Sequence, residues 1–158
     1  MRRRFAASVA AAYDGSGAEK YGGRWNSVDV RVAYASATVS LAALELRVHS
    51  HLHNLASDYV VVYAEIPHDA VTELSILPRG WNELVPSSEV AAVGDEFVRT
   101  GRALALAVPS VVIPSESNYL INPRHPDMAR VRFGDELEPL SFDMRLFRLE
   151  IRPRALET

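Results

Sequence analysis

The sequence has 158 residues, 48% of them hydrophobic and 23% charged, which suits one folded domain and excludes a disordered or fibrous chain. It contains no cysteine, so disulfides, thiol nucleophiles and cysteine-bound zinc are excluded. The formal net charge of −3 argues against direct binding to nucleic acid. No apolar run could cross a membrane and the arginine-rich start lacks a signal-peptide core, so we expect a cytoplasmic protein without membrane contact.

The first third of the chain predicts a loop, a strand and a helix. Residues 14–27 contain four glycines, which is typical of a structured loop with one helical turn. A strand is expected at 31–35, with Val32 and Tyr34 on one face. A helix is expected over 39–52, with Ser36 or Thr38 as its N-cap and an apolar stripe made of Leu41, Leu44, Val48 and Leu52.

The rest of the chain alternates short strands with one further helix. Residues 58–66 predict a core strand that ends at Pro67, with 71–77 as its neighbour and a loop at 78–82. A second helix begins after Ser87 or Ser88 and ends near Arg99 and Gly101. Further strands are expected at 103–107, 110–113, 118–121 and 146–151. This irregular mixture predicts an α+β fold, a single domain over residues 1–158 with two main helices.

Glu45 is the most informative single residue. On a helical wheel it falls inside the apolar stripe, whereas Arg47 points about 200° away and only His49 is a local partner. A buried carboxylate is costly unless a distant group donates hydrogen bonds to it, so Glu45 is a candidate site residue. The alternative is a carboxylate at the edge of the stripe that reaches water.

The turn at residues 22–26 has the composition of an anion site. Gly22 and Gly23 would let backbone N–H groups approach a phosphate, and Arg24 can bind one through two parallel hydrogen bonds. The alternative is a tight loop held in place by a buried Trp25.

The segment 109–126 suits a pocket wall, because its prolines favour an extended backbone. It carries the polar residues Ser110, Ser115, Ser117, Asn118, Asn122 and His125. The alternative is an edge strand with turn residues, and a serine nucleophile is disfavoured because no Gly-x-Ser-x-Gly elbow is present. His49, His51 and His53 lack a third ligand and the usual zinc motif, so no metal site is predicted.

Three ordered segments resemble the RES domain family. They are Tyr-Gly-Gly-Arg-Trp-Asn at 21–26, Val-Ala-Tyr-Ala-Ser at 32–36 with Leu-Ala-Ala-Leu-Glu at 41–45, and the proline- and asparagine-rich segment 109–126. The arginine, glutamate and serine that give the family its name match Arg24, Glu45 and Ser110. The resemblance covers most of the chain and implies a fold similar to ADP-ribosyltransferase toxins.

The resemblance also implies a function and a partner. RES proteins are toxins of type II toxin–antitoxin systems, encoded beside an Xre-type helix-turn-helix antitoxin that would bind this chain tightly, with a homo-oligomer inside that complex left open. The expected activity is degradation of NAD by cleavage of the nicotinamide–ribose bond, with water or phosphate as acceptor. The alternative is an ADP-ribosyltransferase that modifies a protein side chain, and a third hypothesis is a non-catalytic protein that only binds its antitoxin.

The same resemblance suggests residue roles, with NAD as the only small molecule and no metal. Arg24, together with Gly23 and Asn26, would hold the NAD phosphates, and Tyr34 would line the nicotinamide side. Glu45 would stabilise the developing ribosyl cation. Ser110, Asn118 and Asn122 would shape the pocket.

Overall fold

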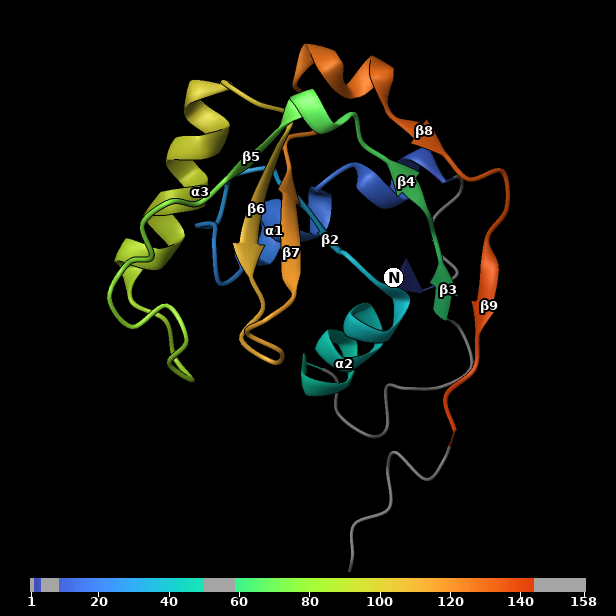
Figure 1. The fold of residues 1–158 in the computed structure, drawn as a ribbon, viewed down its shortest axis with the longest axis horizontal. Helices are drawn as coiled ribbons and strands as arrows, with labels where there is room; N and C mark the ends of the chain where they lie inside the picture. The colour runs from blue at the N-terminus through green and yellow to red at the C-terminus, as the bar shows by residue number, and fades with distance from the viewer. Residues whose placement is uncertain (1, 4–8, 50–58, 144–158) are drawn as a thin grey trace, which may run out of the picture.

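The computed structural model describes residues 2–3, 9–49 and 59–143, and a four-stranded sheet lies at its centre (Figure 1). Its strands, in spatial order, are β2 (Ala33–Ser36), β7 (Ser117–Ile121), β6 (Ala105–Pro109) and β5 (Val71–Glu73). β2–β7 and β7–β6 are antiparallel, whereas β6–β5 is parallel. β2 is therefore an edge strand, open to contacts from beyond the sheet.

A second group of strands stands opposite this sheet (Figure 1). One sheet is antiparallel, with β3 (Tyr59–Val61) between β1 (Arg2–Arg3) and β9 (Glu138–Leu140). β4 (Ala64–Glu65) pairs with β8 (Arg132–Phe133). Short, mostly antiparallel strands with separate helices confirm the predicted α+β fold.

In the part of the chain that the structure describes, three α-helices accompany the strands. α1 (Ser16–Tyr21) precedes β2, α2 (Val39–His49) follows it, and α3 (Ser88–Thr100) packs beside the central sheet (Figure 1). Short 3-10 helices are η1 (Ala10–Tyr13), η3 (His68–Ala70) and η4 (Pro126–Arg130). Among the described residues, no helix has the length and apolar character that a membrane crossing requires.

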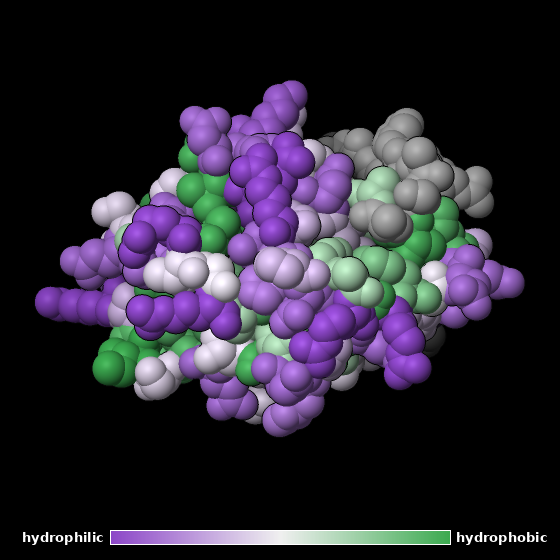
Figure 2. Space-filling view, turned by 90° about the horizontal axis from the view of Figure 1, so that it is seen from above, coloured by the Kyte–Doolittle hydropathy of each residue, from purple (hydrophilic) through white to green (hydrophobic). Residues whose placement is uncertain are grey.

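The alternation of side chains along β7 divides the interior into two cores. Leu120 belongs to a cluster with Trp25 and residues of α3, whereas Ile121 belongs to a cluster with Tyr13 and Leu104. Neighbouring residues of a strand point to opposite faces, so each face of the central sheet has its own apolar cover. In the view of Figure 2, polar side chains dominate the surface and the apolar ones form separate patches.

The ends of both main helices follow the sequence signals. α3 begins after Ser87 and ends at Gly101, whose φ of 55° lets its N–H bond to the carbonyl of Phe97. At α2, Thr38 Oγ1 accepts a hydrogen bond of 3.1 Å from the backbone N–H of Leu41. Thr38, one of the two predicted candidates, is thus the N-cap.

The predicted apolar stripe of α2 is wrong in part. Leu41 is fully buried, but Leu44 and Val48 are exposed, and Leu52 lies outside the described residues. The half-buried side instead includes Ala42 and Glu45. The helix is therefore oriented so that Leu41 and Glu45 lie on its inner side, whereas Leu44 and Val48 do not.

Several predicted strands also need correction. The 58–66 strand is two strands, β3 and β4. Of the segment 71–77 only Val71–Glu73 is a strand, β5, and it pairs with β6 rather than with β3 or β4, because η3 redirects the chain after Pro67. Residues 110–113 form a turn, since the N–H groups of Val112 and Ile113 both donate to Ser110 Oγ. The loop 14–27 contains the six-residue helix α1, and the strand expected at 146–151 lies outside the described residues.

Candidate active site

Glu45 receives hydrogen bonds from two side chains that are distant in the sequence. Ser110 Oγ donates to Glu45 Oε1 at 2.8 Å, and Asn118 Nδ2 donates to the same oxygen at 2.6 Å. Charge-assisted bonds of this kind stabilise an ionised carboxylate away from bulk water. The structure thus brings together three of the residues that the sequence singled out.

Local backbone structure positions Ser110 beneath the carboxylate. Ser110 follows directly after β6, is fully buried, and its N–H donates to the carbonyl of Glu116. Its Oγ accepts from two backbone N–H groups at 3.0 Å each while its own hydrogen points to Glu45. Because the Ser110 hydroxyl already donates one hydrogen bond and accepts two, it serves as a fixed donor and not as an activated nucleophile.

The turn at 22–26 is a compact hydrogen-bonded unit. Asn26 is almost fully buried, and its Nδ2 donates to the carbonyls of Ala18, Ser27 and Val30. Its Oδ1 accepts a 2.8 Å hydrogen bond from the Tyr34 hydroxyl. The Asn26 amide therefore shapes the turn from inside, and its expected contact with NAD stays a prediction.

Tyr34 fastens β2 to this turn. Its hydroxyl also accepts a hydrogen bond from the backbone N–H of Trp25 at 3.1 Å. Burial of that hydroxyl raises the pKa of Tyr34 well above its ordinary value, although 39% of the residue is exposed. A Cβ on Gly23 would lie 2.6 Å from the Tyr34 hydroxyl oxygen, so only glycine fits this approach.

The side chain of Arg24 links the 22–26 turn to the loop that follows β5. Its Nη1 donates to the carbonyls of Trp81 at 2.9 Å and Glu83 at 2.8 Å. Both bonds use the same nitrogen, so toward the described residues the other guanidinium nitrogens of this half-buried side chain make no hydrogen bond. One side of the guanidinium thus holds the loop, and the other can meet an anionic ligand.

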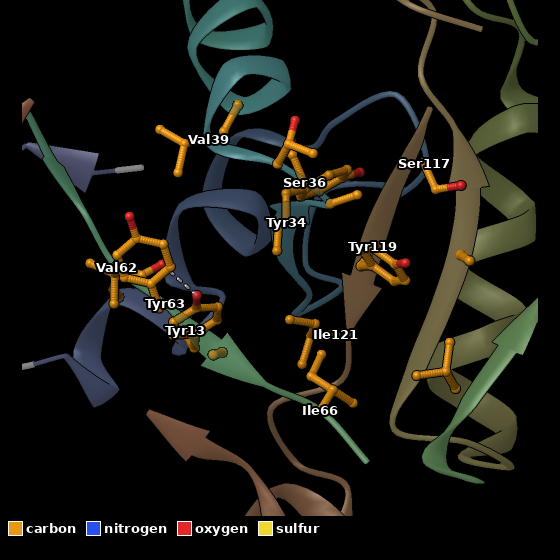
Figure 3. Close-up of a pocket in the computed structure, with 18 of the residues that line it drawn as sticks. Tyr13, Tyr34, Ser36, Val39, Val62, Tyr63, Ile66, Ser117, Tyr119 and Ile121 are labelled. Carbon is orange, nitrogen blue, oxygen red and sulfur yellow. Dashed lines mark hydrogen bonds between the residues drawn. The ribbon is translucent and has the colours of Figure 1, made fainter. Parts of the chain in front are cut away.

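A cavity of about 670 Å³ lies beside β2 and β7 (Figure 3). Aromatic side chains line much of it, among them Tyr13, Tyr63 and Tyr119. Its wall includes Tyr34 and Ser36 but not Glu45, Ser110 or Arg24. We place the candidate site at the Glu45 hydrogen-bond network, because a held carboxylate can stabilise a developing positive charge. The cavity meets this network at Ser36.

Asn122 stands apart from the other candidate residues. It follows the far end of β7, four positions beyond Asn118, which is roughly 13 Å along an extended strand. Its Oδ1 accepts from the backbone N–H of Arg124, as in a turn. The structure separates it from the Glu45 group.

Two hydroxyl residues of the site escaped sequence reasoning in this role. Ser36 Oγ donates to Asn118 Oδ1 at 2.6 Å, and Thr38 Oγ1 donates to Glu116 Oε2 at 3.1 Å. The sequence indicates both only as helix caps, and their partners lie about 80 positions away. No local pattern could have indicated such pairs.

The histidine cluster falls largely outside the description. His51 and His53 are among the residues not described, and the side chain of His49 is not described either. Within the described ranges, no group of three histidine, cysteine or acidic residues could hold a metal ion. The prediction of no metal site stays a prediction.

Comparison with known proteins shows to which family this chain belongs. The family model described as the RES domain matches residues 1–154. The chain belongs to the RES domain family. This RES protein is 36% identical over 121 residues to "Toxin Res" of Photorhabdus laumondii subsp. laumondii, covering 75% of this chain and 78% of that protein. It is 34% identical over 140 residues to "Prs ADP-ribosylating toxin" of Sphingobium sp., covering 85% and 86%.

A solved structure shares the fold of this RES protein. The Mycobacterium tuberculosis MbcT–MbcA toxin–antitoxin complex contains a chain that superposes with a TM-score of 0.65 at 14% identity, covering 81% of this chain and 76% of the other. The expected family and α+β fold are therefore confirmed. The protein is a RES-domain homologue of named toxins.

Proposed function

We propose that this RES protein is the toxin of a toxin–antitoxin system and cleaves the nicotinamide–ribose bond of NAD, with water or phosphate as acceptor. The observation that carries the proposal is the carboxylate of Glu45, held by hydrogen bonds from Ser110 and Asn118. Membership of the RES family and the names of its toxin relatives support the same direction.

The chemistry explains why a held carboxylate matters. As the bond between nicotinamide and ribose breaks, the sugar develops positive charge in an oxocarbenium-like state. A carboxylate fixed beside that charge in a partly dry site stabilises it more than solvent could. We assign this role to Glu45, and Ser110 and Asn118 keep its oxygen in place.

The NAD phosphates require donors at the other end of the site. Arg24 supplies a guanidinium that is already anchored by the carbonyls of Trp81 and Glu83, so little conformational freedom is lost when it binds an anion. Gly23 keeps the backbone close to Tyr34. In this proposal Arg24 binds phosphate, and Tyr34, which lines both the turn and the cavity, contacts the nicotinamide side.

A second candidate function uses the same residues with another acceptor. The relative named as a Prs ADP-ribosylating toxin favours transfer of ADP-ribose to a protein side chain. The two reactions share bond cleavage at Glu45 and differ only in the group that attacks the ribose. A non-catalytic protein that only binds its antitoxin is the third hypothesis.

We propose that the partner is an Xre-type antitoxin that covers the mouth of the site, in the cytoplasm. The support is the solved structure of a toxin–antitoxin complex with the same fold. Co-purification of this chain with the product of a neighbouring antitoxin gene would support the proposal, and recovery of the chain alone would oppose it. The mass of the complex would also give the number of copies of each chain.

The activity is tested by incubating the purified protein with NAD, with and without inorganic phosphate, and measuring released nicotinamide. We expect release by the wild type and a loss of at least about a hundredfold in Glu45→Gln, because the charge at the ribosyl cation is removed. Glu89→Gln, at an exposed position in the first turn of α3, is the matched control and should keep wild-type activity.

The acceptor follows from the products. Release that rises with phosphate and yields ADP-ribose 1-phosphate identifies phosphorolysis, whereas phosphate-independent release of ADP-ribose identifies hydrolysis. If labelled ADP-ribose instead appears on protein in a cell extract, the transferase is correct. Toxicity in cells that survives Glu45→Gln would support the non-catalytic hypothesis and overturn both enzymes.

A further inference from the structure

We infer that Ser36 is a positioning residue that holds the amide of Asn118 against the Glu45 carboxylate. Ser36 Oγ donates to Asn118 Oδ1, and Asn118 Nδ2 donates to Glu45 Oε1, each at 2.6 Å. Ser36 thus acts on Glu45 through Asn118 without touching it. The catalytic part of this inference rests on the proposed function of Glu45.

Sheet register places Ser36 and Asn118 together. The two residues are direct cross-strand partners of β2 and β7, so their side chains leave the sheet on the same face. Val108 is the partner of Asn118 on the other side and offers only an apolar side chain. Of the two cross-strand neighbours of Asn118, it is therefore Ser36 on β2 that supplies a polar contact.

The chemistry of an amide gives the contact its direction. A carboxylate accepts hydrogen bonds and cannot donate them, so Asn118 must present its NH₂ end to Glu45 and its oxygen end elsewhere. Ser36 donates to that oxygen end, which fixes the amide at both ends. A hydrogen bond donated to Oδ1 also polarises the amide, and this strengthens the hydrogen bond from its NH₂ group to the carboxylate.

The start of α2 gives the same network a second restraint. Thr38 caps the helix that carries Glu45 and also binds Glu116, two positions before Asn118. The short β2–α2 connection therefore fixes both the carboxylate and its donor. Ser36 also lines the cavity, so the same residue borders that space and holds the amide.

The kinetic test compares three variants for nicotinamide release. We expect Ser36→Ala to lower kcat on the order of tenfold, as loss of one hydrogen bond would, with KM for NAD within about twofold because the phosphate contacts at Arg24 remain. Ser36→Thr keeps the hydroxyl and should recover most of the rate. Ser40→Ala, on the exposed surface of α2, is the control and should match the wild type.

An NMR measurement tests the contact without relying on activity. In the wild type, one Asn118 side-chain amide proton should be shifted downfield by the carboxylate, with Asn118→Ala used for assignment. Ser36→Ala should move that proton toward the position of a free asparagine and also move the Glu45 carboxyl carbon, whereas Ser40→Ala should move neither. A melting temperature near that of the wild type shows that each variant is folded.

The outcomes separate the two proposals. Unchanged Asn118 and Glu45 resonances in Ser36→Ala overturn the inference, and so does an unchanged kcat in an active enzyme. If the wild type releases no nicotinamide and modifies no protein, the proposed function fails. The NMR signals then still decide whether Ser36 positions Asn118 against Glu45.

Discussion

Ser110 Oγ and Glu45 Oε1 are joined by a 2.8 Å hydrogen bond across 65 positions of the chain. The serine is buried at the end of a central strand, and the glutamate lies on the helix that follows the edge strand. This bond therefore ties α2 to the sheet and orients the carboxylate at once. Stability and activity are coupled at this contact.

Ser110→Ala tests that coupling. The change removes a donor to Glu45 and leaves the N–H groups of Val112 and Ile113 without their acceptor, so we expect a loss of about 1–3 kcal/mol in the free energy of unfolding. Nicotinamide release should fall about ten- to a hundredfold. Urea unfolding and the NAD assay measure the two effects. Ser115→Ala, at an exposed position of the same loop, should change neither, and equal effects of both variants would contradict the assignment.

The sequence predicted the fold best where the signals are local. α3 begins after Ser87 as predicted, although the Ser87 side chain makes no capping hydrogen bond, and it ends before Gly101, whose left-handed conformation acts on the adjacent backbone. The predicted pairing of segment 71–77 with segment 58–66 was wrong, because strand partners depend on contacts that are distant in the chain. The turn after Ser110 was predicted as a strand, because nothing local shows that the serine side chain accepts the backbone N–H groups there.

Arg24→Lys should weaken NAD binding more than catalysis. Lysine keeps the charge but cannot hold the carbonyls of Trp81 and Glu83 and also offer a planar pair of donors to a phosphate. We expect KM for NAD to rise about tenfold while kcat changes less than threefold. Steady-state kinetics provide the measurement, with Arg79→Lys in the same loop as the control. A fall in kcat at constant KM would instead place Arg24 at the reacting bond.

Glu45 could be predicted from the sequence, but the hydrogen bonds that hold it could not. Glu45 was identified from helical periodicity, since a carboxylate on the buried side of α2 requires a donor. Ser110 and Asn118 were among the polar residues of the predicted pocket wall, but nothing local indicated that they bind Glu45. Ser36 was predicted only as a possible helix cap and lies in a segment of the family resemblance, with no role at the carboxylate. The periodicity also favoured Leu44 and Val48 as core residues, and both are exposed, because a wheel drawn from one helix does not show which side of it packs against the sheet.

Tyr34→Phe should change how the free energy of unfolding depends on pH at alkaline pH. Burial raises the pKa of Tyr34, so the fold favours its neutral hydroxyl; that stabilisation is complete below the ordinary tyrosine pKa near 10 and is lost as pH rises through the folded value. Wild-type stability should therefore fall more steeply above about pH 10 than that of Tyr34→Phe.

Urea unfolding of both proteins from pH 7 to 11 provides the measurement. Tyr13, whose pKa is also raised by burial, contributes equally to both curves and cancels in their difference. At pH 7 the variant should be less stable by about 1–3 kcal/mol, because Asn26 Oδ1 and the Trp25 N–H lose their partner. Parallel curves over the whole range would show that the Tyr34 hydroxyl titrates as it does in the unfolded chain.

Gly94→Ala should destabilise the protein more than Ser110→Ala or Tyr34→Phe. A Cβ on Gly94 would lie 1.8 Å from the carbonyl oxygen of Trp25, so α3 or the 22–26 turn must move. We expect a loss of about 3 kcal/mol or more in the free energy of unfolding. Gly17→Ala in α1 is the matched control. Apart from its chain neighbours and the backbone of its own helix, no described atom lies within 4 Å of the new Cβ, and alanine should raise stability by about 0.5–1 kcal/mol.

The same pair of variants reports on the site. Because Trp25 follows Arg24 directly in the chain, a displaced Trp25 carbonyl moves the guanidinium that we assign to the NAD phosphates. Gly94→Ala should therefore raise KM for NAD in the protein that remains folded, whereas Gly17→Ala should leave it unchanged. Wild-type stability and KM in Gly94→Ala would mean that α3 can shift without cost, and that the close contact between α3 and the turn does not hold Arg24 in place.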